Sequence, residues 1–154
     1  MMSQVLIAMV SAVFLLGAVD GCRKGQEEDR AVTRTKETSA SLADLAREAG
    51  VTFPPSARLI GFSREAGIDD YLNFKVEIDA KDLASFLAAS PISADALQPG
   101  EHGRLGPDEG YWDPHRAARL RTGQKMMPNA RYLNIGIGEG GGNVVALYIV
   151  NHGT

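Results

Sequence analysis

The sequence predicts a two-layer α+β domain with about four mostly antiparallel strands and short helices packed on one face of the sheet. The clearest sign is residues 71–78, where apolar and polar side chains alternate strictly. Strict alternation is typical of an antiparallel strand with one buried face and one wet face. The apolar spacing changes to a helical period after Asp79, and two β-type runs at 131–137 and 144–151 end the chain around a glycine-rich turn.

The other elements follow in chain order. Residues 41–50 predict a short amphipathic helix, with Ser41 as its N-cap and Gly50 as its stop. Residues 58–62 predict a strand that precedes the alternating one. The helix after Asp79 takes that residue as its N-cap, with Asp82 completing a capping box.

The long interval from Pro91 to Asn129 should contain short helices, because structureless loops of that length are unusual in a compact domain. Asp113 followed by Pro114 has the pattern of an N-cap and a first helical residue, and Gly123 fits a C-terminal stop. These residues predict a two-turn helix over 114–122.

The N-terminus has the pattern of an export signal. Residues 1–19 carry no charge and are long enough for the apolar core of a signal peptide. The residues Val19-Asp20-Gly21-Cys22 that follow resemble the lipobox of bacterial lipoproteins. In that class the signal is cut before the cysteine, which then receives lipid, so the resemblance implies a lipid anchor at Cys22 and a place in the cell envelope, facing the periplasm or the cell exterior.

The alternative for the N-terminus is an uncleaved membrane anchor. Arg23, Lys24 and Arg30 would then flank the span and, by the positive-inside rule, leave the domain in the cytoplasm. We favour the lipoprotein interpretation, because an uncleaved anchor leaves Gly21-Cys22 unexplained. Cys22 is the only cysteine, so no disulfide within the chain can stabilise the domain.

Three segments are therefore expected along the chain. Residues 1–21 form a signal peptide, 22–40 a lipidated cysteine with a disordered tether, and 41–154 one globular domain. The tether interpretation depends on the polar composition that begins at Arg23, which offers almost no large apolar side chain to bury. The net charge of -3 gives no reason to expect nucleic-acid binding.

No cofactor or metal is expected. Gly136-Ile137-Gly138-Glu139-Gly140-Gly141 has the spacing of a dinucleotide fingerprint, but a β-type run follows where that site needs a helix N-terminus. A second group of residues between positions 102 and 115 contains ligand types, and its spacing fits no established metal site. The members of that group are His102, Asp108, Glu109, Asp113 and His115.

Strand parity suggests a surface for a partner. If the apolar side chains of 71–78 face the helices, the alternate residues of three strands lie on an open face that is rich in tyrosine. Tyrosine and tryptophan are enriched in recognition surfaces. The candidate partner contacts are Tyr71, Asn73, Tyr132, Asn134, Tyr148 and Trp112. The alternative for the tyrosines is that they only support cross-strand pairing in a solvated sheet. For Trp112, the sole tryptophan, packing in the core is expected first and a binding anchor second.

The leading functional hypothesis is a membrane-anchored envelope lipoprotein with a non-catalytic, protein-binding domain, of which inhibitor or immunity-like proteins are one type. One alternative is a small envelope hydrolase that uses His102, His115 and nearby carboxylates. Another is a purely structural envelope component. No catalytic motif in the sequence separates these classes.

Overall fold

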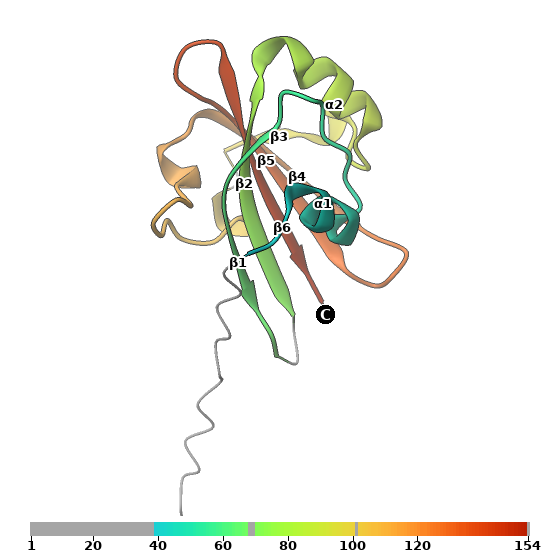
Figure 1. The fold of residues 1–154 in the computed structure, drawn as a ribbon. Coiled ribbons are helices and arrows are strands. Elements are labelled where there is room, and N and C mark those ends of the chain that lie inside the picture. The colour runs from blue at the N-terminus through green and yellow to red at the C-terminus, as the bar shows by residue number, and fades with distance from the viewer. Residues whose placement is uncertain (1–38, 68–69, 101, 154) are drawn as a thin grey trace, which may run out of the picture. The chain divides into compact units, whose positions relative to one another are not determined.

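A computed structural model describes residues 39–67, 70–100 and 102–153. The expected signal peptide, Cys22 and all of the tether before residue 39 lie outside these residues. The domain is a six-stranded antiparallel sheet in the order β1-β2-β6-β5-β4-β3 (Figure 1). The strands are β1 (Arg58–Glu65), β2 (Tyr71–Asp79), β3 (Gln98–Pro99), β4 (Ala118–Met126), β5 (Tyr132–Glu139) and β6 (Val144–His152).

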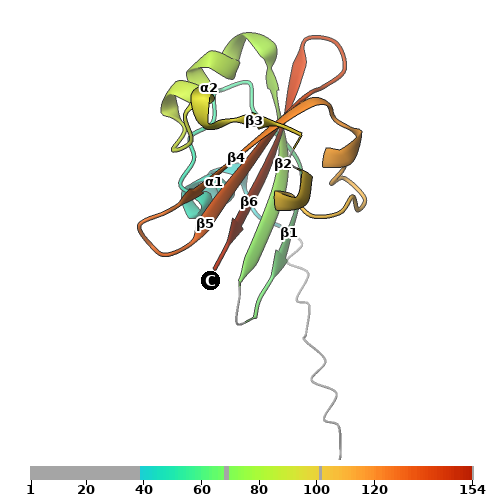
Figure 2. The same cartoon turned by 180° about the vertical axis from the view of Figure 1, so that it is seen from behind.

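The helices α1 (Leu42–Ala49) and α2 (Leu83–Ala89) pack on one face of this sheet. Residues 102–117, here called the cover segment, lie over the opposite face (Figures 1 and 2). They contain two short 3-10 helices, η3 (His102–Arg104) and η4 (Pro114–Arg116). No helix within the part of the chain that the structure describes is long and apolar enough to cross a membrane.

Helix α1 begins and ends as the sequence predicts. The Ser41 hydroxyl accepts a hydrogen bond from the Asp44 backbone N–H at 3.1 Å, which satisfies one of the free donors of the first turn. Gly50 follows the helix with a φ of 68°, a left-handed conformation that glycine adopts without strain. Leu45 and Ala49 point into the core.

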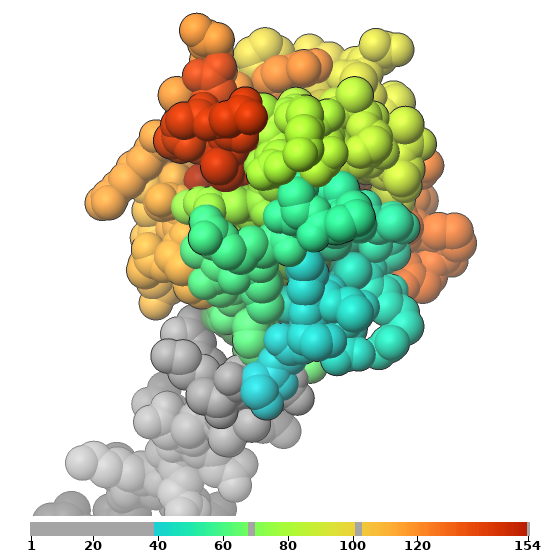
Figure 3. All heavy atoms as spheres, turned by 45° about the horizontal axis from the view of Figure 1, so that its top comes forward, coloured from blue at the N-terminus to red at the C-terminus, as the bar shows by residue number. Residues whose placement is uncertain are grey.

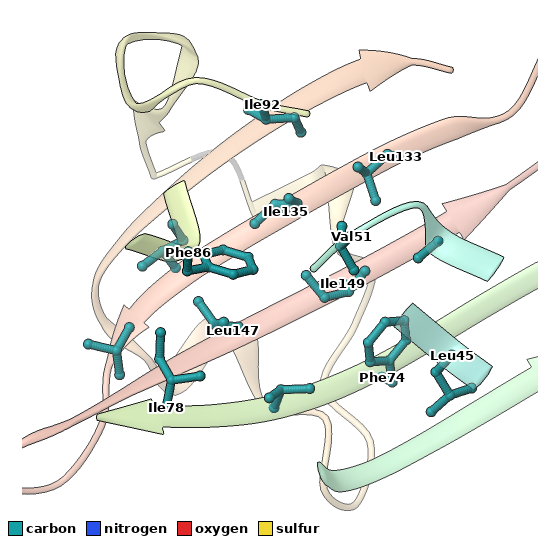
Figure 4. Packing of buried hydrophobic residues seen from close by; sticks show 14 of the residues in the cluster. Leu45, Val51, Phe74, Ile78, Phe86, Ile92, Leu133, Ile135, Leu147 and Ile149 are labelled. Atoms are coloured by element: carbon teal, nitrogen blue, oxygen red, sulfur yellow. The ribbon is translucent and has the colours of Figure 1, made fainter. Parts of the chain in front are cut away.

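The main hydrophobic core lies between the helices and the sheet (Figure 4). Phe74 on β2 and Ile149 on β6 are register partners and are fully buried. Phe53, which precedes β1, stacks on Phe86 of α2 with ring centroids 5.5 Å apart, and it meets Phe74 edge-on. The predicted alternation of 71–78 therefore places the helix-facing side chains correctly.

The prediction of four strands is incomplete, because the sheet has six. Residues 114–122 do not form the expected helix: η4 ends at Arg116, and β4 begins at Ala118. Gly123, read as a helix stop, lies within β4, where an added Cβ would stand 2.8 Å from Ile92 Cγ2. The sheet gains here a full strand of backbone hydrogen bonds, which outweighs the local preference for a helix.

The two aspartates assigned as helix caps also differ from expectation. Asp79 precedes the 3-10 turn η1 (Ala80–Asp82), which leads into α2, and its side chain makes no capping hydrogen bond. The Asp113 side chain does not cap η4, because its carboxylate bonds to groups on the sheet. Both residues lie at helix starts, but the predicted capping interactions are not formed.

The glycine-rich turn joins β5 and β6 as a hairpin. Gly140 N–H donates to Val144 O at 2.9 Å, and no helix follows the glycines. The tip of the hairpin lies beside the start of the η1–α2 segment, where Ala80 N–H donates to Asn143 O at 3.0 Å (Figure 3). These glycines therefore serve a hairpin, as the sequence predicts.

Candidate functional site

The residues predicted to contact a partner fall into two groups. Trp112, Asn134 and Tyr148 are only 3%, 2% and 2% exposed. The expectation of an open, wet face is wrong at Asn134 and Tyr148, because the cover segment lies over this face of the sheet, whereas the packing role expected first for Trp112 is confirmed. Tyr71, Asn73 and Tyr132 are partly exposed.

The cover segment packs on the sheet through two apolar contacts. The Trp112 ring meets the Tyr148 ring edge-on with centroids 5.3 Å apart, and its Nε1–H donates to Leu105 O at 2.9 Å. Leu105 lies over Gly136 of β5, where an added Cβ would stand 2.5 Å from Leu105 Cδ1. The absence of a side chain at Gly136 therefore lets the cover segment approach the sheet closely.

A polar tie holds the same segment in place. The Asp113 Oδ1 atom accepts hydrogen bonds from Lys75 Nζ at 2.6 Å and from the Tyr148 hydroxyl at 2.8 Å. The Lys75 ammonium also lies 5.4 Å from the centre of the Tyr148 ring. One carboxylate on the cover segment thus bonds to two neighbouring strands, β2 and β6.

The protonation states of Asp113 and Tyr148 strengthen these hydrogen bonds. Burial alone would raise the pKa of Asp113, but the hydrogen bonds from Lys75 and Tyr148 outweigh it and hold that pKa below its ordinary value. Burial, and then the hydrogen bond to Asp113, raises the pKa of Tyr148 well above its ordinary value. At neutral pH the carboxylate is therefore charged, and the phenol keeps the proton that it donates.

Tyr111 forms a second contact of the cover segment with the sheet. Its ring packs on Gly61 of β1, and its hydroxyl donates to Asn73 Oδ1 at 2.6 Å. Burial, followed by the nearby Tyr71 and Glu109, raises the pKa of this phenol. Asn73, predicted to contact a partner, thus bonds to the cover segment within the domain.

Next to the cover segment the same face carries a continuous row of partly or largely exposed side chains, of which Tyr71 packs against the cluster of Leu105 and Trp112. Tyr71 pairs with His152, His152 with Tyr132, and Tyr132 with Met126 across four neighbouring strands. The His152 ring stacks on Tyr132 at 5.5 Å and on Tyr71 at 6.5 Å between centroids. Met126 is 62% exposed and ends the row at the side of β4. We call these four residues the exposed row.

Sequence reasoning identified Tyr71 and Tyr132 but missed the other two members. His152 is not among the partner contacts that the sequence predicts, although it is on the same face as Tyr148 by strand parity. Met126 lies at the end of β4, a strand that the sequence does not predict because a helix is expected over 114–122. The signal for His152 was therefore present, whereas Met126 depended on recognising β4.

The histidine-containing group of the cover segment is only partly assembled. His115 Nδ1 lies 2.9 Å from Asp108 Oδ1, and the same oxygen accepts the His115 backbone N–H at 2.9 Å. That backbone hydrogen bond is the main reason that the pKa of Asp108 is lowered. The His102 side chain is outside the described part of the structure, and the described residues contain no group of three or more ligand side chains arranged around a metal position.

No family model, curated protein or solved structure matches this chain.

Proposed function

We propose that this protein is a lipid-anchored envelope protein whose domain binds a protein partner, without catalysis, through the exposed row. The row carries the proposal. It presents two tyrosines, a histidine and a largely exposed methionine side by side over four strands. Aromatic residues and methionine are the types enriched where proteins recognise one another.

The arrangement of the row supports binding more than chance exposure. Tyr71, His152 and Tyr132 hold one another by stacking, so their rings lose little conformational freedom when a partner arrives. They also lie on a sheet whose opposite face is fixed by the main core. A rigid set of amphipathic rings on a stable scaffold resembles the paratopes of antibodies and designed binders.

Anchoring is the second part of the proposal and depends on the lipobox-like residues that end at Cys22. Lipid on both the sulfur and the new amino group of Cys22, as the resemblance to bacterial lipoproteins implies, would satisfy the requirement of more than one chain for stable membrane attachment. The polar residues from Arg23 onward would let the domain stand away from the bilayer. A partner would then be met in the periplasm or at the cell exterior.

Site-specific photo-crosslinking in intact cells tests the binding surface. A benzophenone side chain placed at Tyr132 should give one discrete adduct, and a benzophenone at Ile60 should give none. Ile60 is the matched control because it is an exposed apolar residue on β1, at the opposite edge of the sheet. Tyr71→Ala should abolish the Tyr132 adduct while far-UV circular dichroism stays native. Equal adducts at both positions would contradict the proposal.

A hydrolase is the second candidate, because the Asp108 carboxylate orients His115. A carboxylate–histidine pair is the part of a catalytic triad that abstracts a proton. This alternative predicts that the full chain cleaves chromogenic esters and that His115→Gln abolishes the cleavage. Arg116→Gln is the control, because Arg116 lies beside the same carboxylate at 3.7 Å and has no role in proton transfer.

A further inference from the structure

Among the residues that the structure describes, nothing pairs with the end of β4 beside the exposed row. Strand β3 has only two residues and pairs with Arg121 and Thr122 of β4. Leu120 O accepts from Gly100 N–H on the β3 side, whereas Met127 N–H donates to Arg131 O on the β5 side. By strand alternation, the backbone N–H and C=O groups of Gln124 and Met126 point away from β5. No backbone group of the described residues bonds to them.

The opposite edge of the sheet, formed by β1, is irregular. Strand β1 has a register shift between Leu59 and Gly61, a bulge of the kind that protects an edge from pairing. The open part of β4 has no such irregularity, since its register with β5 is continuous from Arg121 to Met126. The β4 edge is therefore regular where it is open, whereas the β1 edge is interrupted by a bulge.

Both sides of the open edge offer contacts to such a strand. On the covered face of the sheet, Met126 continues the exposed row. On the helix-bearing face lies a mostly apolar hollow of about 470 Å³. Its lining residues are Pro91, Lys125, Met126, Met127, Pro128 and Ala130. The side chains of an added strand point alternately to the two faces, so successive residues would meet the row and the hollow.

The charge of this edge indicates the chemistry of its occupant. Arg121 donates to Ala94 O and Leu97 O, and Lys125 donates to Pro91 O. Neither cation has a carboxylate within ion-pair distance among the described residues. The sequence also holds no acidic residue from 114 to 138. The edge therefore has an excess of positive charge that an acidic partner would complement.

We propose that an extended, acidic segment of the partner protein adds to the sheet as a strand along Gln124–Met126 of β4. This inference rests on the proposed protein-binding function and specifies how the partner is held. Main-chain hydrogen bonds to the edge supply affinity, while the hollow and the exposed row select side chains. A second copy of this chain suits the site poorly, because pairing two such edges would bring Lys125 and Arg121 against their own copies.

Matched substitutions at Gln124 separate strand addition from side-chain contact. Gln124→Pro removes the outward N–H and keeps the inward pairing of β4 with β5, whereas Gln124→Ala removes the side chain and keeps the N–H. The probe is a fluorescein-labelled peptide of alternating valine and glutamate, titrated against the full chain in detergent micelles and followed by anisotropy. Loss of one hydrogen bond should weaken binding about five- to tenfold for Gln124→Pro and have little effect for Gln124→Ala.

Changes to the probe give independent evidence should Gln124→Pro fold poorly. A peptide N-methylated at alternate residues, on the edge that would face β4, should not bind the wild-type protein. A valine–lysine peptide should bind at least about tenfold more weakly than the valine–glutamate one. Absence of binding by the acidic peptide, or equal binding by the N-methylated one, would overturn strand addition. Equal binding by the lysine peptide would overturn the acidic assignment.

Two further measurements identify other occupants. Sedimentation that shows a dimer lost in Gln124→Pro would assign the edge to a second copy. Binding to phosphatidylglycerol vesicles that Lys125→Gln abolishes, without peptide binding, would assign it to a membrane. Either result overturns the inference. Failure of the proposed protein-binding function can be told apart from failure of strand addition. In the first case the crosslinked adduct at Tyr132 would be absent, whether or not the peptide binds.

Discussion

Replacing Asp113 by asparagine removes the charge that faces Lys75 under the cover segment and leaves the shape of the side chain almost unchanged. The Lys75 side chain is 12% exposed and the Asp113 side chain 33% exposed, so the lysine depends on this carboxylate more than the carboxylate depends on it. Asp113→Asn should therefore cost more stability than Lys75→Met. The partly hydrated Asp113 can still accept the hydrogen bond from Tyr148 in the second variant.

The magnitude follows from burial. Breaking a fully buried ion pair costs about 3–5 kcal/mol, and a hydrogen bond to a charged group contributes about 1.5–3 kcal/mol. Partial hydration of Asp113 reduces the loss, so we expect about 2 kcal/mol for Asp113→Asn and about 1 kcal/mol for Lys75→Met. In a domain of this size, 2 kcal/mol lowers the melting temperature by about 10 °C.

Two assays on the full chain measure this effect. Urea unfolding gives the change in free energy, and Trp112, the only tryptophan, reports on the cover segment because its buried ring shifts its emission to longer wavelength when the segment detaches. Lys81→Met is the matched control: Lys81 pairs with Asp79 at the exposed surface, at 3.1 Å, and its loss should not change stability measurably. A cost for Asp113→Asn no larger than that of the control would refute the tie.

The stability of the fold in acid tests whether the Asp113 charge is stabilising. Because the folded pKa of Asp113 is lowered, its charge stabilises the fold above the ordinary aspartate pKa, and this stability is lost as pH falls through the folded value. The difference in stability between the wild type and Asp113→Asn should therefore be largest near neutral pH and shrink below about pH 4. A difference that persists in strong acid would show that the charge is not its source.

Four further predictions follow from the structure and the sequence. Gly136→Ala should destabilise the fold by about 1–3 kcal/mol in urea unfolding, because its Cβ would stand 2.5 Å from Leu105 Cδ1. An unchanged free energy of unfolding would show that the cover segment moves to make room for the added methyl group. Thr122→Val should raise stability by about 1 kcal/mol, because the buried hydroxyl has no hydrogen-bond partner among the described residues; a loss of stability would reveal one. Tyr111 and Tyr148 have raised pKa values, so above about pH 10 stability should fall by up to about 2.7 kcal/mol per pH unit from these two phenols; titration of both, followed by absorbance, before unfolding would contradict this. Cys22→Ala should leave the precursor uncut and unlabelled by a fatty-acid probe, and normal labelling would rule out the anchor.

The strands that the sequence reveals are those with one dominant apolar face. Residues 71–78 alternate because β2 packs its apolar side against the helices while its other side carries polar groups. Strand β4 gives no such signal, because its outer residues are exposed and Leu120 is its only large buried side chain. A strand with so few apolar contacts is held by pairing with β5, and pairing partners far apart in the chain leave no local pattern.

The cover segment could not be foreseen for a related reason. Asp113-Pro114 has the local pattern of a helix start, yet the Asp113 carboxylate bonds to Lys75, which lies 38 positions earlier in the chain. The continuous apolar run of β6 is the sequence feature that indicates a second cover, since a strand that is buried on both faces is apolar at successive residues. It indicated that something covers the second face without indicating which segment does so.

The register of the sheet explains why the candidate site lies where it does. Lys75, Tyr148 and Gly136 form one cross-strand row, and the cover segment packs on all three. The exposed row lies four residues farther along the same strands, which is about 13 Å at 3.3 Å per residue. At the β2 end of the exposed row, Tyr71 packs against the cluster that contains Leu105 and Trp112. Asn73 and Asn134 belong to the cross-strand row that lies between the covered row and the exposed row.

This spacing has a consequence for the proposed function. Tyr71 and the covered residues share strand β2, and Tyr111 of the cover segment bonds to Asn73, two residues from Tyr71. The exposed row and the Asp113 tie are therefore linked along β2 through Asn73, and along β6, which carries both Tyr148 and His152. Asp113→Asn at a temperature where the domain remains folded should loosen Trp112 and leave crosslinking from Tyr132 intact. Loss of that adduct at full secondary structure would mean instead that the cover segment itself forms part of the binding surface.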